Sequence, residues 1–375
     1  VVDTEKKAVR LSLDRRAFSP NGDGVMDTVT LLPENQSSTV VRSWSVTVSG
    51  ADDAKVRGFS GTGSLPAKLA WDGKRDDGTR APDGIYHASL EVGYVTAEKQ
   101  SARTVDFALD TIPPAIEVGG LDTLFSPDGD GRKDVVRVAQ KSVPGDTWEG
   151  RMLNQAGQTV RSWTWKDSAL DLEWDGADTE GNKAADGTYR YEVRSEDPAG
   201  NKAQKTVDRI VIDTRQTQVF VTASAAGFSP NSDGAFDDLS LGLVVKLADG
   251  IDAWRLSIVD EEGSARRTFQ GKGASTIPAR QVWDGKSDDG SVKSGTYTAV
   301  FTVDYLKGDR AEARSGAFTL DIDGPKVALT TTPKYFSPDN DGVDDELRIS
   351  PSVADASVLD SRRFESIEVA GGEGR

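Results

Sequence analysis

The sequence has no cysteine, only one histidine (His87), and no apolar run near the length of a membrane-spanning helix. The lack of cysteine excludes disulfides, thiol catalysis and thiolate metal sites. With a single histidine, predicted to lie on the surface of a strand, neither a Ser-His-Asp triad nor most kinds of zinc site is expected. A bilayer span needs roughly 20 consecutive apolar residues, so no direct membrane span is expected either.

Basic charge is also scarce, because 45 lysines and arginines stand against 61 aspartates and glutamates, a net charge of −16. Nucleic-acid binding needs a concentrated basic face, so we expect no nucleic-acid partner. An acidic surface suits a soluble, self-repelling protein or one that binds divalent cations. The first residues, Val1 to Thr4, lack the layout of a signal peptide, so we expect any targeting segment to have been removed or to lie outside this sequence.

Three markers recur along the chain in one order and with one period. The first is Phe-Ser-Pro followed by an acidic, glycine-rich loop, and it begins at Phe18, Phe125, Phe228 and Phe336. The second is Trp-Asp-Gly, which begins at Trp71, Trp174 and Trp283. The third is an aspartate that ends the last strand before a linker, at Asp110, Asp213 and Asp323. A period of about 100 residues predicts a tandem array of modules: module 1 (residues 1–110), module 2 (111–213), module 3 (214–323) and an incomplete module 4 (324–375).

Short segments of alternating apolar residues predict seven strands in each full repeat. In module 1 they are residues 9–13, 29–31, 44–48, 56–59, 69–71, 86–92 and 105–109. Seven short strands in about 100 residues, separated by turn signals, are typical of immunoglobulin-like or fibronectin-III-like β-sandwiches. The predicted class is therefore all-β. Trp44, Trp254 and the tryptophans of Trp-Asp-Gly are interpreted as core residues, since their spacing places them inside.

The fourth repeat stops early. Strands are predicted near Val327, Leu347 and Ile367, but the Trp-Asp-Gly marker and the last strands are missing. Either the sequence ends within the module or another chain supplies the missing strands. A half-sandwich exposes strand edges and apolar surface that something must cover.

The Phe-Ser-Pro-Asn-Gly-Asp-Gly phrase from Phe18, followed by Asp27, Trp71-Asp-Gly and Asp83-Gly-Ile-Tyr86, resembles the FlgD-type Ig-like family. That family includes the Ig-like domain of flagellar hook-capping proteins, the C-terminal domains associated with gliding motility, and accessory domains of exported proteases. The resemblance covers the three full repeats and the start of the fourth. It implies an Ig-like fold and a spacer, anchor or assembly role, and it implies no activity.

Each acidic loop places an oxygen-bearing side chain at loop positions 1, 3 and 7, and position 5 offers a backbone carbonyl. Calcium prefers six to eight oxygen ligands, so the loops are candidate Ca²⁺ sites. The bidentate glutamate of a complete EF-hand is absent at position 12, where Leu32, Ala139, Gly242 and Ser350 stand. The candidate ligands are Asn21, Asp23, Val25 and Asp27; Asp128, Asp130, Arg132 and Asp134; Asn231, Asp233, Ala235 and Asp237; Asp339, Asp341, Val343 and Asp345.

The alternative interpretation is that these side chains only form Asx turns, which shape a sharp loop without metal. Repulsion among the carboxylates of one loop favours a cation over that alternative. If consecutive strands alternate in direction, the Phe-Ser-Pro and Trp-Asp-Gly loops lie at the same pole, where the last strand also leaves the module. Asp72, Asp76 and Asp77 of the second loop are better explained as turn formers.

The leading functional hypothesis is a non-catalytic structural or adhesive stalk in a bacterial envelope or secreted protein, located in the periplasm, at the cell surface or outside the cell. The expected partners are neighbouring modules of the chain and an envelope or surface protein that the sequence does not identify. Two alternatives stay open: an accessory, non-catalytic region of a larger secreted enzyme such as a protease, and a module that binds glycans or envelope polymers. The last would use exposed aromatic residues, for which Tyr94 and Trp165 are the candidates.

Overall fold

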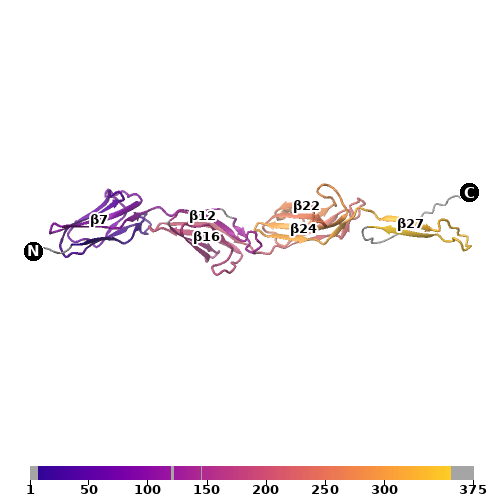
Figure 1. Ribbon diagram of the computed structural model, residues 1–375, viewed down its shortest axis with the longest axis horizontal. Coiled ribbons are helices and arrows are strands. Elements are labelled where there is room, and N and C mark those ends of the chain that lie inside the picture. The colour runs from indigo at the N-terminus through magenta and orange to yellow at the C-terminus, as the bar shows by residue number, and fades with distance from the viewer. Residues whose placement is uncertain (1–6, 120–121, 145, 356–375) are drawn as a thin grey trace. The chain divides into compact units, whose positions relative to one another are not determined.

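The computed structural model describes residues 7–119, 122–144 and 146–355, and almost all of its regular structure is β-strand. The chain divides into two compact units, Val1–Thr214 and Arg215–Arg375. Figure 1 shows modules 1 and 2 in indigo to magenta and the second unit in orange to yellow. In the described residues the only helix is one turn of 3-10 helix, η1 (Ala274–Thr276), and no helix could span a membrane.

Module 1 forms two facing sheets. One has the strand order β1-β3-β6, and the other has the order β2-β9-β7-β4-β5, with β8 paired to β7. The bounds are β1 (Val9–Leu13), β2 (Ala17–Phe18), β3 (Val29–Asn35), β4 (Val41–Gly50), β5 (Lys55–Thr62), β6 (Leu69–Trp71), β7 (Gly84–Tyr94), β8 (Lys99–Arg103) and β9 (Phe107–Leu109).

The chain changes sheets early in each module. In module 1, β1 pairs antiparallel with β3, whereas β2, which follows after a short crossing, pairs in parallel with the last strand β9. This pairing places Phe18 opposite Leu109, so the Phe-Ser-Pro loop starts beside the exit of the module. The other pairs of module 1 are antiparallel, as expected of an Ig-like sandwich.

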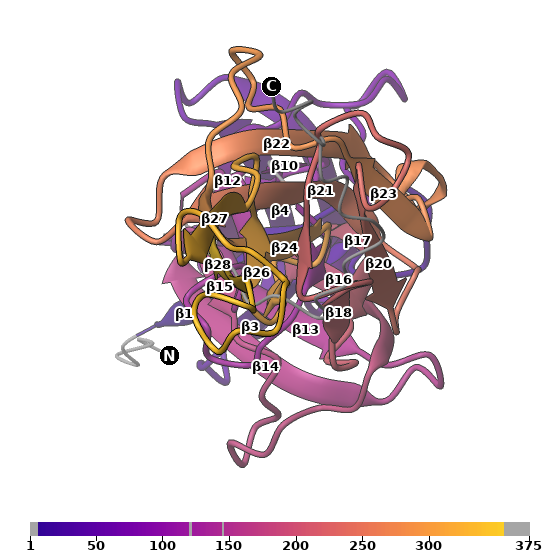
Figure 2. The same ribbon diagram turned by 90° about the vertical axis from the view of Figure 1, so that its right-hand side faces the viewer.

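Modules 2 and 3 repeat this plan. Their smaller sheets have the orders β10-β12-β15 and β18-β20-β23, and their larger sheets have the orders β11-β17-β16-β13-β14 and β19-β26-β24-β21-β22, with β25 paired to β24. Figure 2 shows β18, β20 and β23 beside the larger sheet of module 3. The bounds in module 2 are β10 (Ile116–Gly119), β11 (Leu124–Phe125), β12 (Val136–Ser142), β13 (Asp146–Leu153), β14 (Thr159–Asp167), β15 (Leu172–Trp174), β16 (Gly187–Glu196) and β17 (Lys202–Ile212). Those in module 3 are β18 (Val219–Ala223), β19 (Gly227–Phe228), β20 (Leu239–Val245), β21 (Ile251–Asp260), β22 (Ala265–Lys272), β23 (Arg280–Trp283), β24 (Gly295–Tyr305), β25 (Arg310–Arg314) and β26 (Phe318–Leu320).

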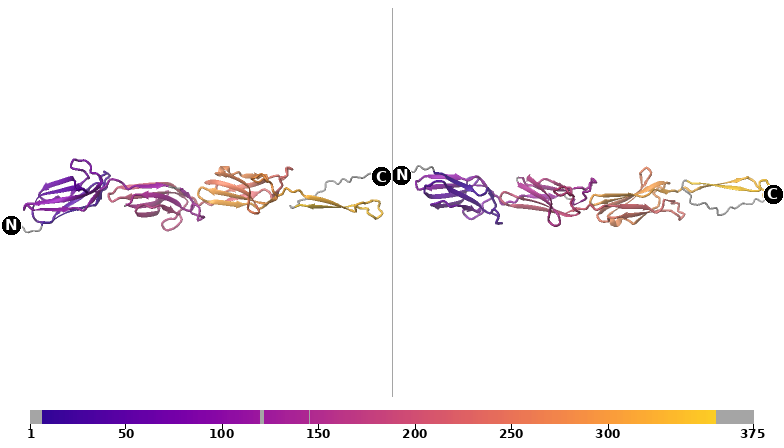
Figure 3. Two further views of the ribbon diagram at one scale, coloured as in Figure 1. Left: turned by 45° about the horizontal axis from the view of Figure 1, so that its top comes forward. Right: turned by 90° about the horizontal axis from the view of Figure 1, so that it is seen from below.

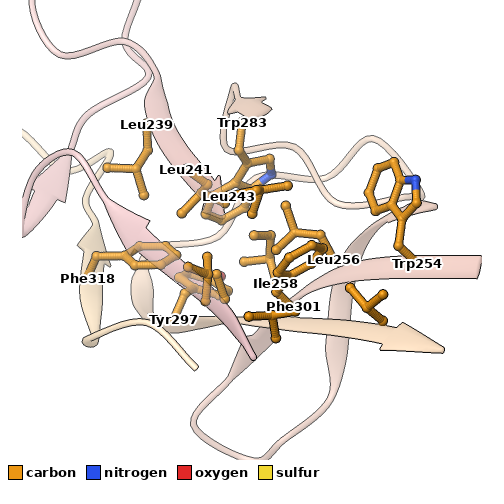
Figure 4. Packing of buried hydrophobic residues seen from close by; sticks show 14 of the residues in the cluster. Leu239, Leu241, Leu243, Trp254, Leu256, Ile258, Trp283, Tyr297, Phe301 and Phe318 are labelled. Atoms are coloured by element: carbon orange, nitrogen blue, oxygen red, sulfur yellow. The ribbon is translucent and has the colours of Figure 1, made fainter. Parts of the chain in front are cut away.

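Three separate hydrophobic cores lie between these sheets, one within each full repeat. In module 3, Leu239, Leu241 and Leu243 of β20 face Phe301 and Phe318 of the opposite sheet, as Figure 4 shows. Because each core draws its residues from one repeat only, each repeat buries its own apolar surface. The predicted all-β class, with tandem Ig-like sandwiches, is confirmed.

The seven strands predicted for module 1 are present, and two more accompany them. The two-residue β2 is too short to show alternation, and β8 is polar throughout, with the sequence Lys-Gln-Ser-Ala-Arg. Val105, predicted to belong to the last strand, lies outside β9 and is 54% exposed. In module 2 the counterparts of β8 and β9 form one continuous strand, β17, which pairs with β16 across an irregularity near Tyr189.

The described part of module 4 is a two-stranded hairpin of β27 (Lys326–Thr332) and β28 (Arg348–Ala354), which appears as a twisted ribbon in both views of Figure 3. Its register places Leu329 opposite Pro351, just as β1 and β3 place Leu11 opposite Pro33. The third strand predicted near Ile367 lies outside the described residues.

Candidate functional site

The Phe-Ser-Pro and Trp-Asp-Gly loops lie at the same pole of each full module, as predicted. The glycine of Trp-Asp-Gly packs directly on the proline of Phe-Ser-Pro. A Cβ atom added to Gly73 would lie 2.7 Å from Cγ of Pro20, and the corresponding distances from Gly176 to Pro127 and from Gly285 to Pro230 are both 2.9 Å. The two loops therefore form one packed surface at the exit of the module.

The tryptophan of Trp-Asp-Gly closes the core at this pole, as expected. Trp71 is fully buried, its ring centroid lies 5.4 Å from that of Phe18, and its indole N–H donates a 2.8 Å hydrogen bond to the carbonyl of Lys74. Trp174 and Trp283 are buried and make the same bond to the carbonyls of Ala177 and Lys286. The Trp-Asp-Gly loop is thus fixed on its core side by the indole hydrogen bond and on its other side by the proline of the Phe-Ser-Pro loop.

Within the first acidic loop, carboxylates accept backbone hydrogen bonds. The two oxygens of Asp27 accept from the amides of Gly22 at 2.7 Å and Gly24 at 2.9 Å. The amide of Asp23 donates to Oδ1 of Asn21 at 2.9 Å, and the amide of Val25 donates to Oδ1 of Asp23 at 2.7 Å. These are Asx-turn contacts, which compensate the exposed backbone of a sharp loop.

All four loops repeat this network. Asp134, Asp237 and Asp345 each accept two amides as Asp27 does. The residue at loop position 6 adopts a left-handed conformation in every loop, with φ between 47° and 57° at Met26, Lys133, Phe236 and Asp344. A left-handed φ is energetically unfavourable for a residue other than glycine. Its presence in all four loops indicates that the repeated hydrogen bonds hold each loop in one defined conformation.

The predicted ligand residues of each loop are brought together, with a difference between the odd and even loops. In module 2 the carboxylates of Asp128, Asp130 and Asp134 each offer an oxygen within 4.8 Å of the others, and module 4 offers the matching group Asp339, Asp341 and Asp345. In module 1 the Nδ2 of Asn21 instead donates to Asp23 at 3.1 Å, and Asn231 donates to Asp233 at 3.0 Å. The asparagine amide thus places a donor beside a carboxylate, a contact that a third aspartate cannot make.

The aspartates of the Trp-Asp-Gly loops act as turn formers, as expected. Asp72 accepts a hydrogen bond from the amide of Lys74 and pairs with its ammonium at 2.9 Å. Asp77 accepts from both the amide and the hydroxyl of Thr79, and these contacts lower its pKa below the usual aspartate value. Asp76 binds the amide of Gly58 on the neighbouring strand. None of these three side chains belongs to the carboxylate groups of the Phe-Ser-Pro loops.

In the first unit, the pole of module 1 holds a hairpin of module 2, the turn between β16 and β17. Asn201 of that turn is 2% exposed. Its Oδ1 accepts a 2.6 Å hydrogen bond from the hydroxyl of Ser19, and its Nδ2 donates to the carbonyl of Asp110 at 2.9 Å. Asp197 holds the asparagine from behind, accepting from its backbone amide and from Nδ2, both at 2.9 Å.

No pattern in the sequence predicts this contact. Asp197-Pro-Ala-Gly-Asn201 is an ordinary turn signal, and nothing in it shows that its side chains bind another module. Gly200 has a φ of 90°, and a Cβ there would lie 3.1 Å from Cγ1 of Val25 and 3.4 Å from Cγ of Met26. The turn therefore approaches the Phe-Ser-Pro loop so closely that a side chain at this position would crowd it.

Two predictions about exposure were wrong. His87, predicted at the surface, is 4% exposed, and its Nε2 lies 3.1 Å from Oδ1 of Asp53 at the adjacent turn. Tyr94, proposed as an exposed aromatic residue for glycan binding, is 1% exposed and donates its hydroxyl to Asn35 at 2.8 Å. His87 breaks the alternation of β7, so the period-2 pattern assigned its side chain to the surface. Tyr94 lies in phase with the buried residues of the strand, so the alternation itself places it in the core. Trp165, the other aromatic candidate, is half-buried and packs against the core of module 2.

Comparison with known families and structures gives one match to a family model. Residues 144–199, which extend from β13 to the turn after β16 and include Trp174, match the model of the FlgD Ig-like domain. The resemblance inferred from the repeated motifs is thus confirmed by this segment of module 2. No curated protein matches the sequence.

Several solved structures share similarity with the chain at low identity. A tetra-tandem repeat from the extending region of a large adhesion protein has 16% identity over 93% of this chain and 81% of that one, with a TM-score of 0.28. A bacterial ice-binding adhesin of 1.5 MDa has 15% identity over 86% of this chain and all of that one, with a TM-score of 0.35. Latent PorU from Porphyromonas gingivalis has 11% identity over 84% of this chain and 34% of that one, with a TM-score of 0.25.

Proposed function

We propose that this chain is a non-catalytic spacer, a segment of tandem Ig-like modules that holds other parts of a bacterial envelope or secreted protein apart. The observation that carries the proposal is the built junction of the first unit. Asn201 and Gly200 of module 2 seat against Ser19 and Met26 of module 1, with the polar side chains buried and hydrogen-bonded. A buried, satisfied polar contact specifies one arrangement, because moving it leaves groups unpaired. A fixed arrangement is what a spacer needs and a flexible linker lacks.

Small-angle X-ray scattering of the whole chain tests the spacer function. A compact globule of this length has a radius of gyration of about 21 Å. A spacer is expected to have a clearly larger radius, unchanged between low and moderate salt because buried contacts are screened less than exposed ones. A radius near the compact value would contradict the proposal.

We further propose that the acidic loops bind Ca²⁺ and that the cation stiffens the pole of each module. The support is the carboxylate grouping of the loops in modules 2 and 4, together with the carboxylate repulsion that a cation relieves. The turn hydrogen bonds leave lone pairs on the same oxygens, so the turn network and a cation are compatible. With few ligands from the protein, the affinity is expected in the range of extracellular modules, about 10⁻⁴–10⁻³ M.

Thermal melting in calcium and in chelator tests this second proposal. A ligand that binds only the folded state raises the melting temperature by mass action. The Asp23→Ala, Asp130→Ala, Asp233→Ala variant should lose the calcium-dependent rise in the melting of modules 1 to 3, while the loop of module 4 is left unchanged. A matched variant, Asp77→Ala, Asp178→Ala, Asp289→Ala, removes three turn aspartates from the other loops. It should melt earlier in both conditions yet keep the rise, and a chain without any rise at millimolar calcium would leave only the turn interpretation.

A further inference from the structure

The Phe-Ser-Pro loop of module 1 and the residue after β9 form a socket with three parts, all in contact with the turn of module 2. Its base is the hydroxyl of Ser19, which is fully buried and bonded to Asn201. Its rim is the pair Val25 and Met26, against which Gly200 packs. Its side is the carbonyl of Asp110, which accepts the amide of Asn201. The socket therefore recognises a turn that ends in glycine and asparagine, by shape at the glycine and by hydrogen bonds at the asparagine.

Module 3 carries the same socket in an open state. Ser229, which corresponds to Ser19, is half-exposed, and no hydrogen bond from its hydroxyl is found among the residues that the structure describes. Phe236, which corresponds to Met26, is 72% exposed although it holds the same left-handed conformation, with φ of 57° against 49°. An exposed aromatic ring on a strained backbone costs free energy that contact with a partner would offset.

The open socket has the shape of the occupied one before any partner binds. Asp237 accepts the amides of Ser232 at 2.6 Å and Gly234 at 2.9 Å, as Asp27 does in module 1. Pro230 packs on Gly285 as Pro20 packs on Gly73. Such preorganisation lowers the cost of binding, because little has to be ordered when the partner arrives.

The number of residues between consecutive modules indicates which partner fits the open socket of module 3. The last core residue of one module and the first apolar residue in the first strand of the next are seven positions apart at each junction: Leu109 and Ile116, Ile212 and Val219, Leu320 and Val327. The hairpin β27–β28 also repeats the register of β1–β3, with Leu329 in the place of Leu11 and Phe336 in the place of Phe18. Leu11 and Phe18 are 5% and 0% exposed, whereas Leu329 and Phe336 are 57% and 43% exposed. The hairpin thus has the form of the first strands of a sandwich, and its apolar residues need the remaining strands.

We propose that the pole of module 3, formed by Ser229, Ala235 and Phe236, is a docking site for a β-hairpin turn. The occupant is the turn between the last two long strands of the sandwich that β27 and β28 begin, in the place that the Asp197–Asn201 turn takes on module 1. The inference extends the spacer function to a further junction. It does not depend on calcium.

A cyclic peptide tests the docking site on the intact chain. The probe has the sequence of residues 194–204, which pair as a hairpin from Arg194–Gln204 to Glu196–Lys202, and a disulfide between two added terminal cysteines closes it. The cysteine-free chain cannot exchange with this disulfide. The peptide is added to the chain up to several millimolar in the presence of a calcium chelator, and the backbone amide chemical shifts of the chain are followed by NMR. We expect saturable shifts confined to residues 229–237.

Matched variants make the result specific. The peptide with Asn201→Ala should bind at least about tenfold more weakly, since one lost buried hydrogen bond has about that effect and the asparagine makes two to the socket. On the Ser229→Ala chain, the two peptides should differ less, because the bond to the hydroxyl is gone and only the bond from the asparagine to the carbonyl of Asp321, the counterpart of Asp110, still distinguishes them. No saturable shift at residues 229–237, or equal binding of both peptides to the parent chain, would overturn the proposal.

The same titration separates this inference from the spacer function. Residues 19–27 should not shift, because the tethered turn of module 2 already occupies that socket at a high effective concentration. Shifts there with none at residues 229–237 would contradict both proposals. Shifts at both sites would support recognition of the turn by the socket, and they would show that the junction of modules 1 and 2 opens in solution, against the spacer function.

Discussion

At the scale of single residues, the packing of the two loops at the module pole depends on positions that accept only glycine. Gly73 has a φ of 75° and no room for a Cβ beside Pro20, whereas Gly78, in the turn that follows, has a φ of 82° and nothing within 4 Å of a Cβ. Both glycines meet the conformational need of a turn. Only Gly73 also meets a packing need, because it allows the two loops of the pole to touch.

This difference predicts unequal costs for two alanine substitutions. Gly78→Ala should destabilise module 1 by about 1 kcal/mol, the cost of a left-handed alanine. Gly73→Ala should cost about 2–4 kcal/mol, since crowding against Pro20 adds to the same backbone cost. Hydrogen exchange of the β7 amides measures the stability of this module separately from the others. Equal costs for the two variants would mean that the contact between the loops contributes nothing.

At the scale of strands, the larger sheet of module 2 is tied to the smaller one by a polar contact in its core. Tyr191 of β16 is fully buried and donates its hydroxyl to Oε1 of Gln140 of β12 at 2.9 Å. Burial raises the pKa of this tyrosine far above its usual value. Modules 1 and 3 have Ala88 and Ala299 at the corresponding position of the strand, so this tie is particular to module 2.

Removing the hydroxyl tests the tie between the two sheets. Tyr191→Phe should destabilise module 2 by about 1–2 kcal/mol, because Oε1 of Gln140 is left without its donor in the core. Adding Gln140→Leu should recover part of the loss, since the unpaired acceptor is then removed as well. Urea denaturation followed by hydrogen exchange at β16 gives both values. A double variant less stable than the sum of the two single effects would contradict this account.

At the scale of the whole molecule, the junction of modules 1 and 2 contains a carboxyl group whose surroundings disfavour its ionised form. Burial raises the pKa of Asp146, at the start of β13, and the negative charges of Asp197 and Asp110 raise it further. The folded state therefore holds this proton up to a higher pH than the unfolded chain does. The contribution of Asp146 is then unfavourable above its folded pKa, and the penalty disappears as the pH falls below the unfolded value.

The Asp146→Asn variant should therefore be more stable than the parent at pH 7, and the gain should vanish near pH 3, where the aspartate is protonated as well. The size is expected to be about 0.3 kcal/mol, because Asp146 is only partly buried and solvent screens its interactions. Comparing melting temperatures of the two proteins at both pH values measures the difference, and salt near 1 M should reduce it. A variant less stable than the parent at pH 7 would show that the carboxylate has a favourable partner instead.

The amino-acid sequence by itself determined the repeat, the all-β class, the core tryptophans and the oxygen-rich loops. These follow from strand alternation and turn chemistry, which act between residues close together in the chain. The polar strand β8 left no such pattern, because its pairing with β7 needs no apolar face. The burial of His87 was not predicted because it depends on the turn that carries Asp53, which lies far from His87 in the sequence.

Only the tertiary structure decided what the poles bind. Ser19 and Asn201 are 182 positions apart, and each belongs to a motif that forms a turn whether or not the other is present. Ser19 and Ser229 stand in the same Phe-Ser-Pro motif, yet one is buried against a neighbouring module and the other is half-exposed. The physical reason is that a local pattern reports how a loop folds, whereas its burial depends on which surface the fold brings against it.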